Sequence, residues 1–429
     1  MNAFISLAAY DADPKIAGYG FAKSLDFLNG KTLIEHQVEA LRSNGINRIY
    51  IAIPKGQEAI LDAFGKNDDL HLITLSASLS TAGALAFVPK DEDLLFVPGN
   101  LVFDVNLPPF FQYHQKKGAY MTCFTHPEPH PESKDVLVAR NDGQGFIILP
   151  KETTSARDFY YKNLIPTDLC ILSPDILETL DEDDPCPMDI RKEILEPSLA
   201  IESLFAYQSS DYVKAIVDER SKNEIEKDLS RGIVQKRNTK RPQKAFFLDR
   251  DGTINVFGGF VTEPDMLVLI PGAAKAIRRI NEEGHLAILA TNQPVVARGE
   301  TTIETMRQIL ARLEVLLGKE GAYLDGIYFC PHFPRAVEGS NPTFTQVCDC
   351  RKPKIGMLLK AKSRYNIDFS SSWFIGDTMK DVQTGLNAGT HTALLLGGDP
   401  NPTRECQDAK PEKIYTTLEQ AIDDILAKN

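Results

Sequence analysis

The sequence lacks any run of eighteen apolar residues, so no segment is long enough to cross a bilayer as a helix. It also lacks an excess of positive charge. The formal net charge of −12 disfavours nucleic acid and anionic membrane surfaces as main partners. Residues 1–9 contain no basic residue of the kind that opens a signal peptide. We therefore expect a cytoplasmic protein that binds neither nucleic acid nor membrane.

Cysteine is scarce and unevenly placed. Only 7 of the 429 residues are cysteine, and Cys330, Cys348 and Cys350 fall in one short window. An odd number of cysteines in a chain without a secretion signal favours a metal site over disulfides. The length favours two or three domains, and a composition of 43% hydrophobic and 25% charged residues is that of a globular protein.

In the amino-terminal half, short apolar runs typical of strands alternate with the hydrophobic spacing of an amphipathic helix. Residues 4–7, 48–53 and 94–97 are short apolar runs typical of buried strands, and residues 32–43 have the pattern of an amphipathic helix. Alternating strands and helices predict an α/β fold with a doubly wound, mostly parallel sheet.

Over residues 1–225 the sequence resembles the sugar-phosphate nucleotidyltransferases. The resemblance lies in residues 23–33, which follow the family's nucleotide loop, in residues 81–85, which contact the base in the family, and in residues 163–174. It implies a Rossmann-like domain that once joined a nucleotide to a sugar phosphate.

Three departures from that family predict a degenerate domain. Residues 7–15 replace the family's glycine-rich loop and carry Asp11 and Asp13, which would repel a triphosphate. The two metal-binding aspartates of the family fall on Asn100 and near Lys214. We expect that nucleotidyl transfer is lost. The alternatives are a chain with both activities, or a front half that acts as a sugar-nucleotide sensor or homo-oligomer surface.

A basic segment separates the two halves. Residues 230–244 are poor in apolar side chains, and no aromatic residues interleave with their charges as nucleic-acid binding would require. We predict an exposed linker there. The predicted domains are then residues 1–229 and 245–429.

The carboxyl-terminal half delivers polar residues after four predicted strands. Residues 246–248 lead into Asp249 and Asp251, whose side chains point the same way from an extended chain. The strand at residues 286–290 leads into Thr291, the strand at residues 326–329 leads into Cys330, and the strand at residues 372–375 leads into Asp377. With Lys352, the three aspartates and Thr291 meet the needs of phosphoryl transfer through an aspartyl-phosphate.

Their order and spacing resemble the haloacid dehalogenase (HAD) superfamily of phosphatases. The resemblance implies that Asp249 is the nucleophile and that Asp251 is the general acid and base. It also implies that Mg²⁺ binds Asp249, the Asp251 carbonyl and Asp377, with Asp381 in support. No insertion is long enough for a cap domain, so we expect a second Rossmann-like domain without a cap.

By the same resemblance, Thr291 and Lys352 hold the transferring phosphoryl group. Residues 351–358 and residues 291–299 look like the heptose bisphosphate phosphatases, with histidinol phosphatases as the alternative. The substrate is then a small phosphorylated sugar, whose second phosphate or hydroxyls would contact Asn292, Arg351 and Arg298. Residues 293–295 depart from the heptose family, which has a small Ser-Gly pair there.

A Cys-x-His pair and a Cys-x-Cys pair bound the loop 330–350. Cys330, His332, Cys348 and Cys350 supply three thiolates and one imidazole, a ligand set that closes a tetrahedral Zn²⁺ site. Because no coordination position stays open, we expect this zinc to be structural.

Overall fold

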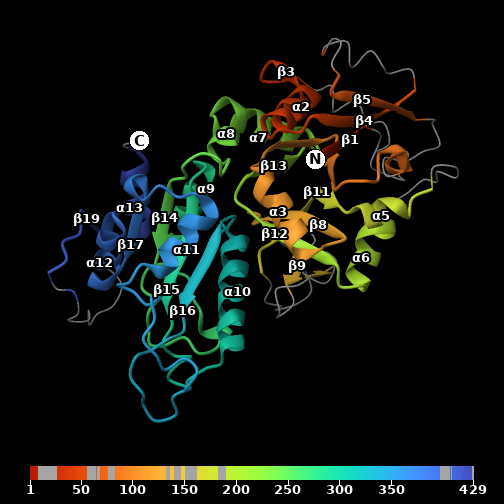
Figure 1. The fold of residues 1–429 in the computed structure, drawn as a ribbon. Coiled ribbons are helices and arrows are strands. Elements are labelled where there is room, and N and C mark those ends of the chain that lie inside the picture. Colours follow the sequence, from red (N-terminus) through yellow and green to blue (C-terminus); the bar gives the residue numbers. More distant parts are fainter. Residues whose placement is uncertain are drawn as a thin grey trace. The chain divides into compact units, whose positions relative to one another are not determined.

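The structure is a computed structural model of the 429-residue chain (Figure 1). The residues that it describes are 1–7, 27–55, 64, 68–75, 83–131, 136–139, 146–149, 162–181, 190–396, 406 and 408–427. The predicted nucleotide loop with Asp11 and Asp13, and parts of segments 23–33 and 81–85, lie outside the described residues. No helix among the residues in these ranges is both long and apolar enough to span a membrane.

The first sheet has seven strands, as expected for a doubly wound domain. In spatial order its strands are β12 (Leu204–Gln208), β8 (Met121–His126), β11 (Ile165–Leu172), β6 (Leu94–Pro98), β1 (Asn2–Ser6), β4 (Arg48–Pro54) and β5 (Leu70–Leu75). The pairs β1–β4, β1–β6, β4–β5 and β8–β12 are parallel, and β11 runs antiparallel to β6.

Helix α2 shows how sequence sets an element here. It spans Leu33–Ser43, and Thr32 caps it in a capping box with Glu35. Its apolar face packs on the sheet through Ile34, Val38 and Leu41. The other elements are η2 (Gly83–Phe87), α3 (Leu107–Lys117), α5 (Pro174–Glu178), η4 (Arg191–Leu195), α6 (Glu196–Ala200), and the pairs β2–β3 (Phe27–Leu28, Lys31–Thr32), β7–β13 (Leu101–Asp104, Tyr212–Ala215) and β9–β10 (Val136–Ala139, Phe146–Leu149).

The predicted linker is partly buried. Helix α7 (Glu219–Ser230) continues into α8 (Ile233–Lys236), and Ile233 and Val234 pack in a cluster with Ile225 and Leu229. The expectation of a wholly exposed segment was therefore wrong for this part, because two apolar residues were enough to anchor one helical turn. The chain forms two compact units that meet in sequence between Asn238 and Thr239, and parts of 126–165 belong to the second unit.

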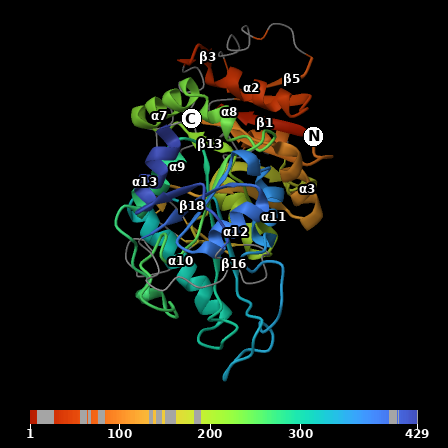
Figure 2. The same cartoon turned by 90° about the vertical axis from the view of Figure 1, so that its left-hand side faces the viewer.

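The second sheet is entirely parallel. Its six strands are, in order, β16 (Gly326–Cys330), β15 (Leu286–Asn292), β14 (Ala245–Leu248), β17 (Trp373–Gly376), β18 (His391–Leu395) and β19 (Lys413–Tyr415). Helices α9 (Ala273–Glu282), α10 (Ile303–Lys319), α11 (Gly356–Tyr365), α12 (Met379–Ala388) and α13 (Leu418–Ala427), with η5 (Pro264–Met266) and η6 (Phe369–Ser371), connect them. Figure 2 shows the long loop between β16 and α11 extending away from the sheet.

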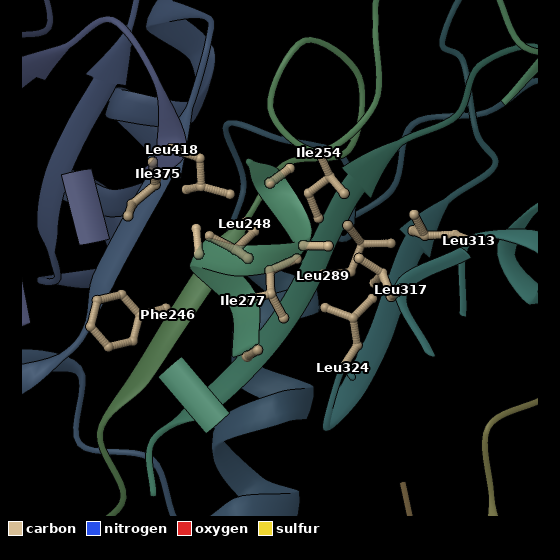
Figure 3. Close-up of a cluster of buried hydrophobic side chains, with 14 of the residues drawn as sticks. Phe246, Leu248, Ile254, Ile277, Leu289, Leu313, Leu317, Leu324, Ile375 and Leu418 are labelled. Atoms are coloured by element: carbon tan, nitrogen blue, oxygen red, sulfur yellow. The ribbon is translucent and has the colours of Figure 1, made fainter. Parts of the chain in front are cut away.

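Alternate residues of β14 serve the two faces of this sheet. Phe246 and Leu248 lie in the larger core, where Ile277 of α9, Leu313 of α10 and Leu418 of α13 cover the sheet (Figure 3). Ala245 and Phe247 point to the opposite face, which α11 covers. Because both faces are buried, the strand reads as an unbroken apolar run and its first polar residue marks its end.

Candidate active site

Three neighbouring strands bring acidic and hydroxyl groups to one edge of the second sheet. Strands β15, β14 and β17 are parallel, so their carboxyl ends coincide. Asp249 follows β14, Thr291 lies near the end of β15, and Asp377 follows β17. These residues are only 9%, 1% and 7% exposed, so their polar groups need partners within the protein or in a ligand.

Lys352 lies between two of the carboxylates. Its Nζ is 2.8 Å from Asp249 Oδ1 and 2.5 Å from Asp381 Oδ1. The second oxygen of Asp381 accepts hydrogen bonds from the Thr378 hydroxyl and backbone at the start of α12. Burial alone would lower the pKa of Lys352, but the two carboxylates raise that pKa above its ordinary value. The ammonium is therefore a fixed positive charge at the site.

The carboxylates exceed this one positive charge. Oxygens of Asp249, Asp377 and Asp381 lie within 4.8 Å of one another. Burial, together with the charges of Asp249 and Asp381, raises the pKa of Asp377 to about 8. If all three carboxylates were ionised beside one ammonium, two negative charges would be in excess, and this repulsion contributes to the raised pKa of Asp377. Hard oxygen ligands of this kind fit a divalent cation such as Mg²⁺, which would stabilise the ionised carboxylates.

Asp251 has a different environment from Asp249. Its Oδ1 accepts from Arg250 at 2.8 Å and from Asn255 at 3.1 Å, and its Oδ2 accepts from Gln293 at 2.9 Å. Arg250 is fully buried. Burial would raise the pKa of Asp251, but the Arg250 charge and the hydrogen bonds from its neighbours leave that pKa below its ordinary value. Burial raises the pKa of Asp249 to about 6, although the charge of Lys352 opposes this shift, so the two acids differ in proton affinity.

A tight turn sets this arrangement. The carbonyl of Arg250 accepts from the backbone of Ile254 and Asn255, at 2.8 and 3.0 Å. Gly252 sits at φ 75°, a region that favours glycine. The turn folds Asn255 back onto the Asp251 carboxylate. The roles of Arg250 and Asn255 were not foreseen from sequence, although a basic residue between two acids directly after a buried strand was a usable signal.

The side chains of residues 291–293 make different hydrogen bonds. Thr291 Oγ1 accepts a hydrogen bond from Gln293 Nε2 at 3.0 Å. Both polar ends of the Asn292 side chain bind the main chain of Lys352, with the Lys352 N–H donating at 3.0 Å and the Asn292 Nδ2 donating at 3.2 Å. The amide expected to contact substrate is thus engaged in holding the lysine. From the sequence, Gln293 was noted only as part of a departure from the heptose family, without a role of its own.

The four expected metal ligands lie together in the loop after β16. The Sγ atoms of Cys330, Cys348 and Cys350 are 3.2 to 3.5 Å apart, and His332 Nδ1 is 3.3 Å from Cys350 Sγ. All four donor atoms could hold one metal ion. Three sulfurs and one imidazole nitrogen fit the tetrahedral preference of Zn²⁺.

Two arginines expected near the substrate contact loop residues. Arg351 donates to the His332 carbonyl at 3.1 Å, and its guanidinium lies 5.1 Å from the centre of the Phe333 ring. Arg298 forms an ion pair with Glu300 at 2.5 Å. These contacts place Arg351 against the cysteine loop and do not themselves define a phosphate site.

In the amino-terminal unit, the two positions compared with the family's metal-binding aspartates have structural contacts. Asn100 Nδ2 donates to the Ile216 carbonyl at 3.3 Å, and Lys214 forms an ion pair with Asp228 at 2.7 Å. A Cβ on Gly99 would lie 2.4 Å from the Ser6 carbonyl oxygen, so close packing of strands requires this glycine. Neither Asn100 nor Lys214 supplies a carboxylate for a metal.

Comparison with known proteins assigns the two halves to different families. The HAD-hydrolase-like family model matches residues 349–421, and the nucleotidyl transferase family model matches residues 20–150. The D-glycero-beta-D-manno-heptose-1,7-bisphosphate 7-phosphatase of Yersinia pestis is 43% identical over 152 residues, which are 35% of this chain and 79% of that protein.

The enzyme of the same name from Escherichia coli (strain K12) is 40% identical over 165 residues, covering 38% of this chain and 85% of that protein. Among solved structures, D,D-heptose 1.7-bisphosphate phosphatase from B. bronchiseptica, complexed with magnesium and phosphate, is 29% identical with a TM-score of 0.37. The alignment with that structure covers 44% of this chain and 100% of the B. bronchiseptica chain. The carboxyl-terminal half therefore belongs to the family of the D-glycero-beta-D-manno-heptose-1,7-bisphosphate 7-phosphatases within the HAD-like hydrolases, and it is a phosphoric monoester hydrolase fused to a nucleotidyltransferase-type domain.

Proposed function

We propose that residues 245–429 remove the 7-phosphate of D-glycero-beta-D-manno-heptose 1,7-bisphosphate through an aspartyl-phosphate on Asp249. The observation that supports this proposal most is the pairing of Asp249 with Lys352 at 2.8 Å, beside a second acid with a different environment. The names of the relatives supply the substrate class. A bound Mg²⁺, held by Asp249, Asp377 and the Asp251 carbonyl, would neutralise phosphate charge.

In the first step, the Asp249 carboxylate attacks phosphorus and the bond from phosphorus to the sugar oxygen breaks. Asp251 gives its proton to that leaving oxygen. The approaching phosphate opposes the effect of Arg250 and favours the protonated form of Asp251. Lys352 and the Thr291 hydroxyl stabilise the negative charge on the transferring group.

In the second step, Asp251 takes a proton from water, and the water oxygen attacks the phosphorus of the aspartyl-phosphate. The bond to Asp249 breaks and inorganic phosphate leaves, which restores the carboxylate of Asp249 and the protonated form of Asp251. The ammonium of Lys352 stays beside Asp381 in both steps, and the bound phosphoryl group supplies negative charge while Asp249 is phosphorylated.

Phosphate release from a panel of esters tests this proposal. The panel contains the heptose 1,7-bisphosphate, hexose mono- and bisphosphates and histidinol phosphate, with ³¹P NMR to identify the phosphate that is lost. We expect fastest release from the 7-position of the heptose. Preference for histidinol phosphate would instead support the alternative named above.

The Asp249→Asn variant separates chemistry from folding. We expect it to lose at least about 10⁴-fold in kcat while it keeps its circular dichroism spectrum. The matched control is Asp408→Asn, since Asp408 is exposed near the carboxyl terminus. Full activity of Asp249→Asn would refute the aspartyl-phosphate.

We further propose that residues 1–229 no longer transfer nucleotides, with residues 230–244 joining the two domains. The amide at Asn100 and its bond to the Ile216 carbonyl support this view. Incubation with each nucleoside triphosphate and heptose 1-phosphate should release no pyrophosphate above background. Release of pyrophosphate would favour a bifunctional enzyme, and binding without turnover would favour a sensor.

The loop cluster is proposed to hold one structural Zn²⁺ through Cys330, His332, Cys348 and Cys350. Thiolates persist in a reducing compartment, which supports a cytoplasmic location.

A further inference from the structure

We propose that Gln293 is a positioning residue that couples the acid–base carboxylate of Asp251 to the hydroxyl of Thr291. Its side-chain amide donates to Asp251 Oδ2 at 2.9 Å and to Thr291 Oγ1 at 3.0 Å. The inference rests on the phosphatase chemistry proposed above. It concerns a residue that directs two functional groups without touching the reacting atoms.

The orientation of the Gln293 amide follows from its partner. An ionised carboxylate can only accept hydrogen bonds, so the atom that faces Asp251 Oδ2 is the amide nitrogen. The same nitrogen has two hydrogens, and Thr291 Oγ1 lies within reach of the second. One NH₂ group therefore serves both neighbours.

This donation determines what the Thr291 hydroxyl can do. A hydroxyl has one hydrogen to donate and two lone pairs that accept. Because Gln293 donates to the oxygen, the hydroxyl hydrogen of Thr291 is directed away from Gln293 and is available to a phosphoryl oxygen. Thr291 is 1% exposed, so water cannot readily take the place of Gln293.

The position of Gln293 is itself fixed. Its side chain is buried, with 2% of the residue exposed, and its backbone N–H donates to the Cys330 carbonyl at 2.8 Å. On the other side of the carboxylate, Arg250 and Asn255 donate to Asp251 Oδ1. Both oxygens of Asp251 thus accept hydrogen bonds. Among these donors, Gln293 also donates to Thr291, which is proposed to bind the phosphoryl group.

The choice of glutamine has a physical reason. Glutamate has the same shape but would place a second negative charge 2.9 Å from Asp251. Leucine has a similar volume but would leave the Asp251 and Thr291 oxygens without this donor. The two variants Gln293→Glu and Gln293→Leu therefore remove the coupling in different ways.

The test compares two phosphate esters that differ in how much their leaving oxygen needs protonation by a general acid. Phenyl phosphate has a poor leaving group, whereas p-nitrophenyl phosphate releases p-nitrophenolate, which is stable as an anion. For each, kcat/KM reports the steps up to the aspartyl-phosphate. We expect Gln293→Leu to lose about 10²-fold with phenyl phosphate and less than about tenfold with p-nitrophenyl phosphate, since only the first depends on the general acid.

A double-mutant cycle adds a second readout. In an Asp251→Asn background, Gln293→Leu should cause no further change in leaving-group sensitivity, because it acts through Asp251. Gln383→Glu is the matched control, since Gln383 makes one hydrogen bond to Asn387 on α12. If Gln293→Leu fails to fold, Gln293→Glu replaces it in both measurements.

The outcomes separate this inference from the proposed function. Equal losses with both esters, or additive effects in the Asp251→Asn background, would overturn the role of Gln293 while the wild-type phosphatase activity stands. A wild-type protein that hydrolyses no phosphate ester would instead overturn the proposed function.

Discussion

Asn292 and Lys352 hold each other through two hydrogen bonds that run in opposite directions. The Lys352 N–H donates to Asn292 Oδ1 at 3.0 Å, and Asn292 Nδ2 donates to the Lys352 carbonyl at 3.2 Å. The pair joins the end of β15 to the segment that follows the cysteine loop. The Lys352 ammonium reaches Asp249 from a backbone that is fixed at this point.

Removing this pair should reduce catalysis more than stability. We expect Asn292→Ala to lower kcat by about 10²-fold, since small displacements of a catalytic group have effects of this size. Two lost hydrogen bonds should cost about 1–3 kcal/mol in the free energy of unfolding. Steady-state kinetics and urea unfolding measure the two effects.

The chain contains a matched control for that variant. Asn281 forms the same kind of reciprocal pair with the main chain of Tyr323, at 3.1 and 3.2 Å. Asn281→Ala should cost a similar free energy of unfolding without lowering kcat. Equal kcat losses in the two variants would show that general destabilisation, not the placement of Lys352, explains the Asn292 result.

The metal-free protein should become less stable as the pH rises. The pKa of Asp377 is raised from 3.8 to about 8, so the folded state binds this proton more tightly than the unfolded state. Its stabilising contribution is fully present below about pH 4 and is lost as the pH passes through about 8. Melting temperatures measured in a chelator between pH 5 and 9 should therefore fall.

Magnesium should reverse this trend, because the cation binds the deprotonated carboxylate. The rise in melting temperature on adding Mg²⁺ should be larger at pH 8.5 than at pH 5.5. Asp377→Asn should flatten the metal-free slope and remove most of the Mg²⁺ response. A response to Mg²⁺ of the same size at both pH values would contradict the assignment of Asp377 as a ligand.

Loss of one cysteine ligand should disorder the loop and reach the active site. Cys348→Ser should reduce bound zinc from about one ion per chain, a stoichiometry expected of a single tetrahedral site. It should also lower kcat, since Lys352 follows Cys350 by two residues. Elemental analysis, limited proteolysis of residues 331–355 and kinetics give three independent readouts.

Cys406→Ser is the control for that experiment, because Cys406 lies outside the four-residue cluster. Unchanged zinc content in Cys348→Ser would contradict the proposed ligand set. A loss of zinc with unchanged kcat would keep the metal site but exclude its influence on Lys352.

Gly376 should not tolerate a side chain. A Cβ there would lie 2.4 Å from Asp381 Cγ and 2.5 Å from its Oδ2. We expect Gly376→Ala to displace Asp381 from Lys352 and from Thr378, with a cost of about 1–3 kcal/mol in the free energy of unfolding and a lower kcat. Gly258→Ala, where a Cβ meets no atom within 4 Å, is the control. Wild-type kcat in Gly376→Ala would show that Asp381 can move without harm.

Local sequence patterns predicted the strands β1, β4 and β6 of the first sheet and β14, β15 and β17 of the second. The apolar run before Asp249 ends as a strand at Leu248, and the helix predicted at 32–43 begins after Thr32 because a capping box fixes its start. Such signals lie within a few neighbouring residues, so no tertiary information is needed to find them.

The contacts between side chains within the site were harder to predict from the sequence. Lys352 and Asp381 were both identified, but their contact depends on how α12 follows β17, and it joins residues 29 positions apart. The role of Arg250 was missed although its partner Asp251 is the next residue. The role of Gln293 was missed because it arises only when residues of separate segments, 42 positions apart, meet. The burial of Ile233 and Val234 was missed for the same reason.

Cys330 ends β16 and belongs to two sites at once. Its sulfur faces Cys348 and Cys350, while its carbonyl accepts the backbone N–H of Gln293. An oxidant that modifies this thiol alters a residue whose own carbonyl is hydrogen-bonded to Gln293, the residue that orients Asp251. Phosphate release by this enzyme would then decline in step with thiol oxidation, even though no carboxylate is chemically altered.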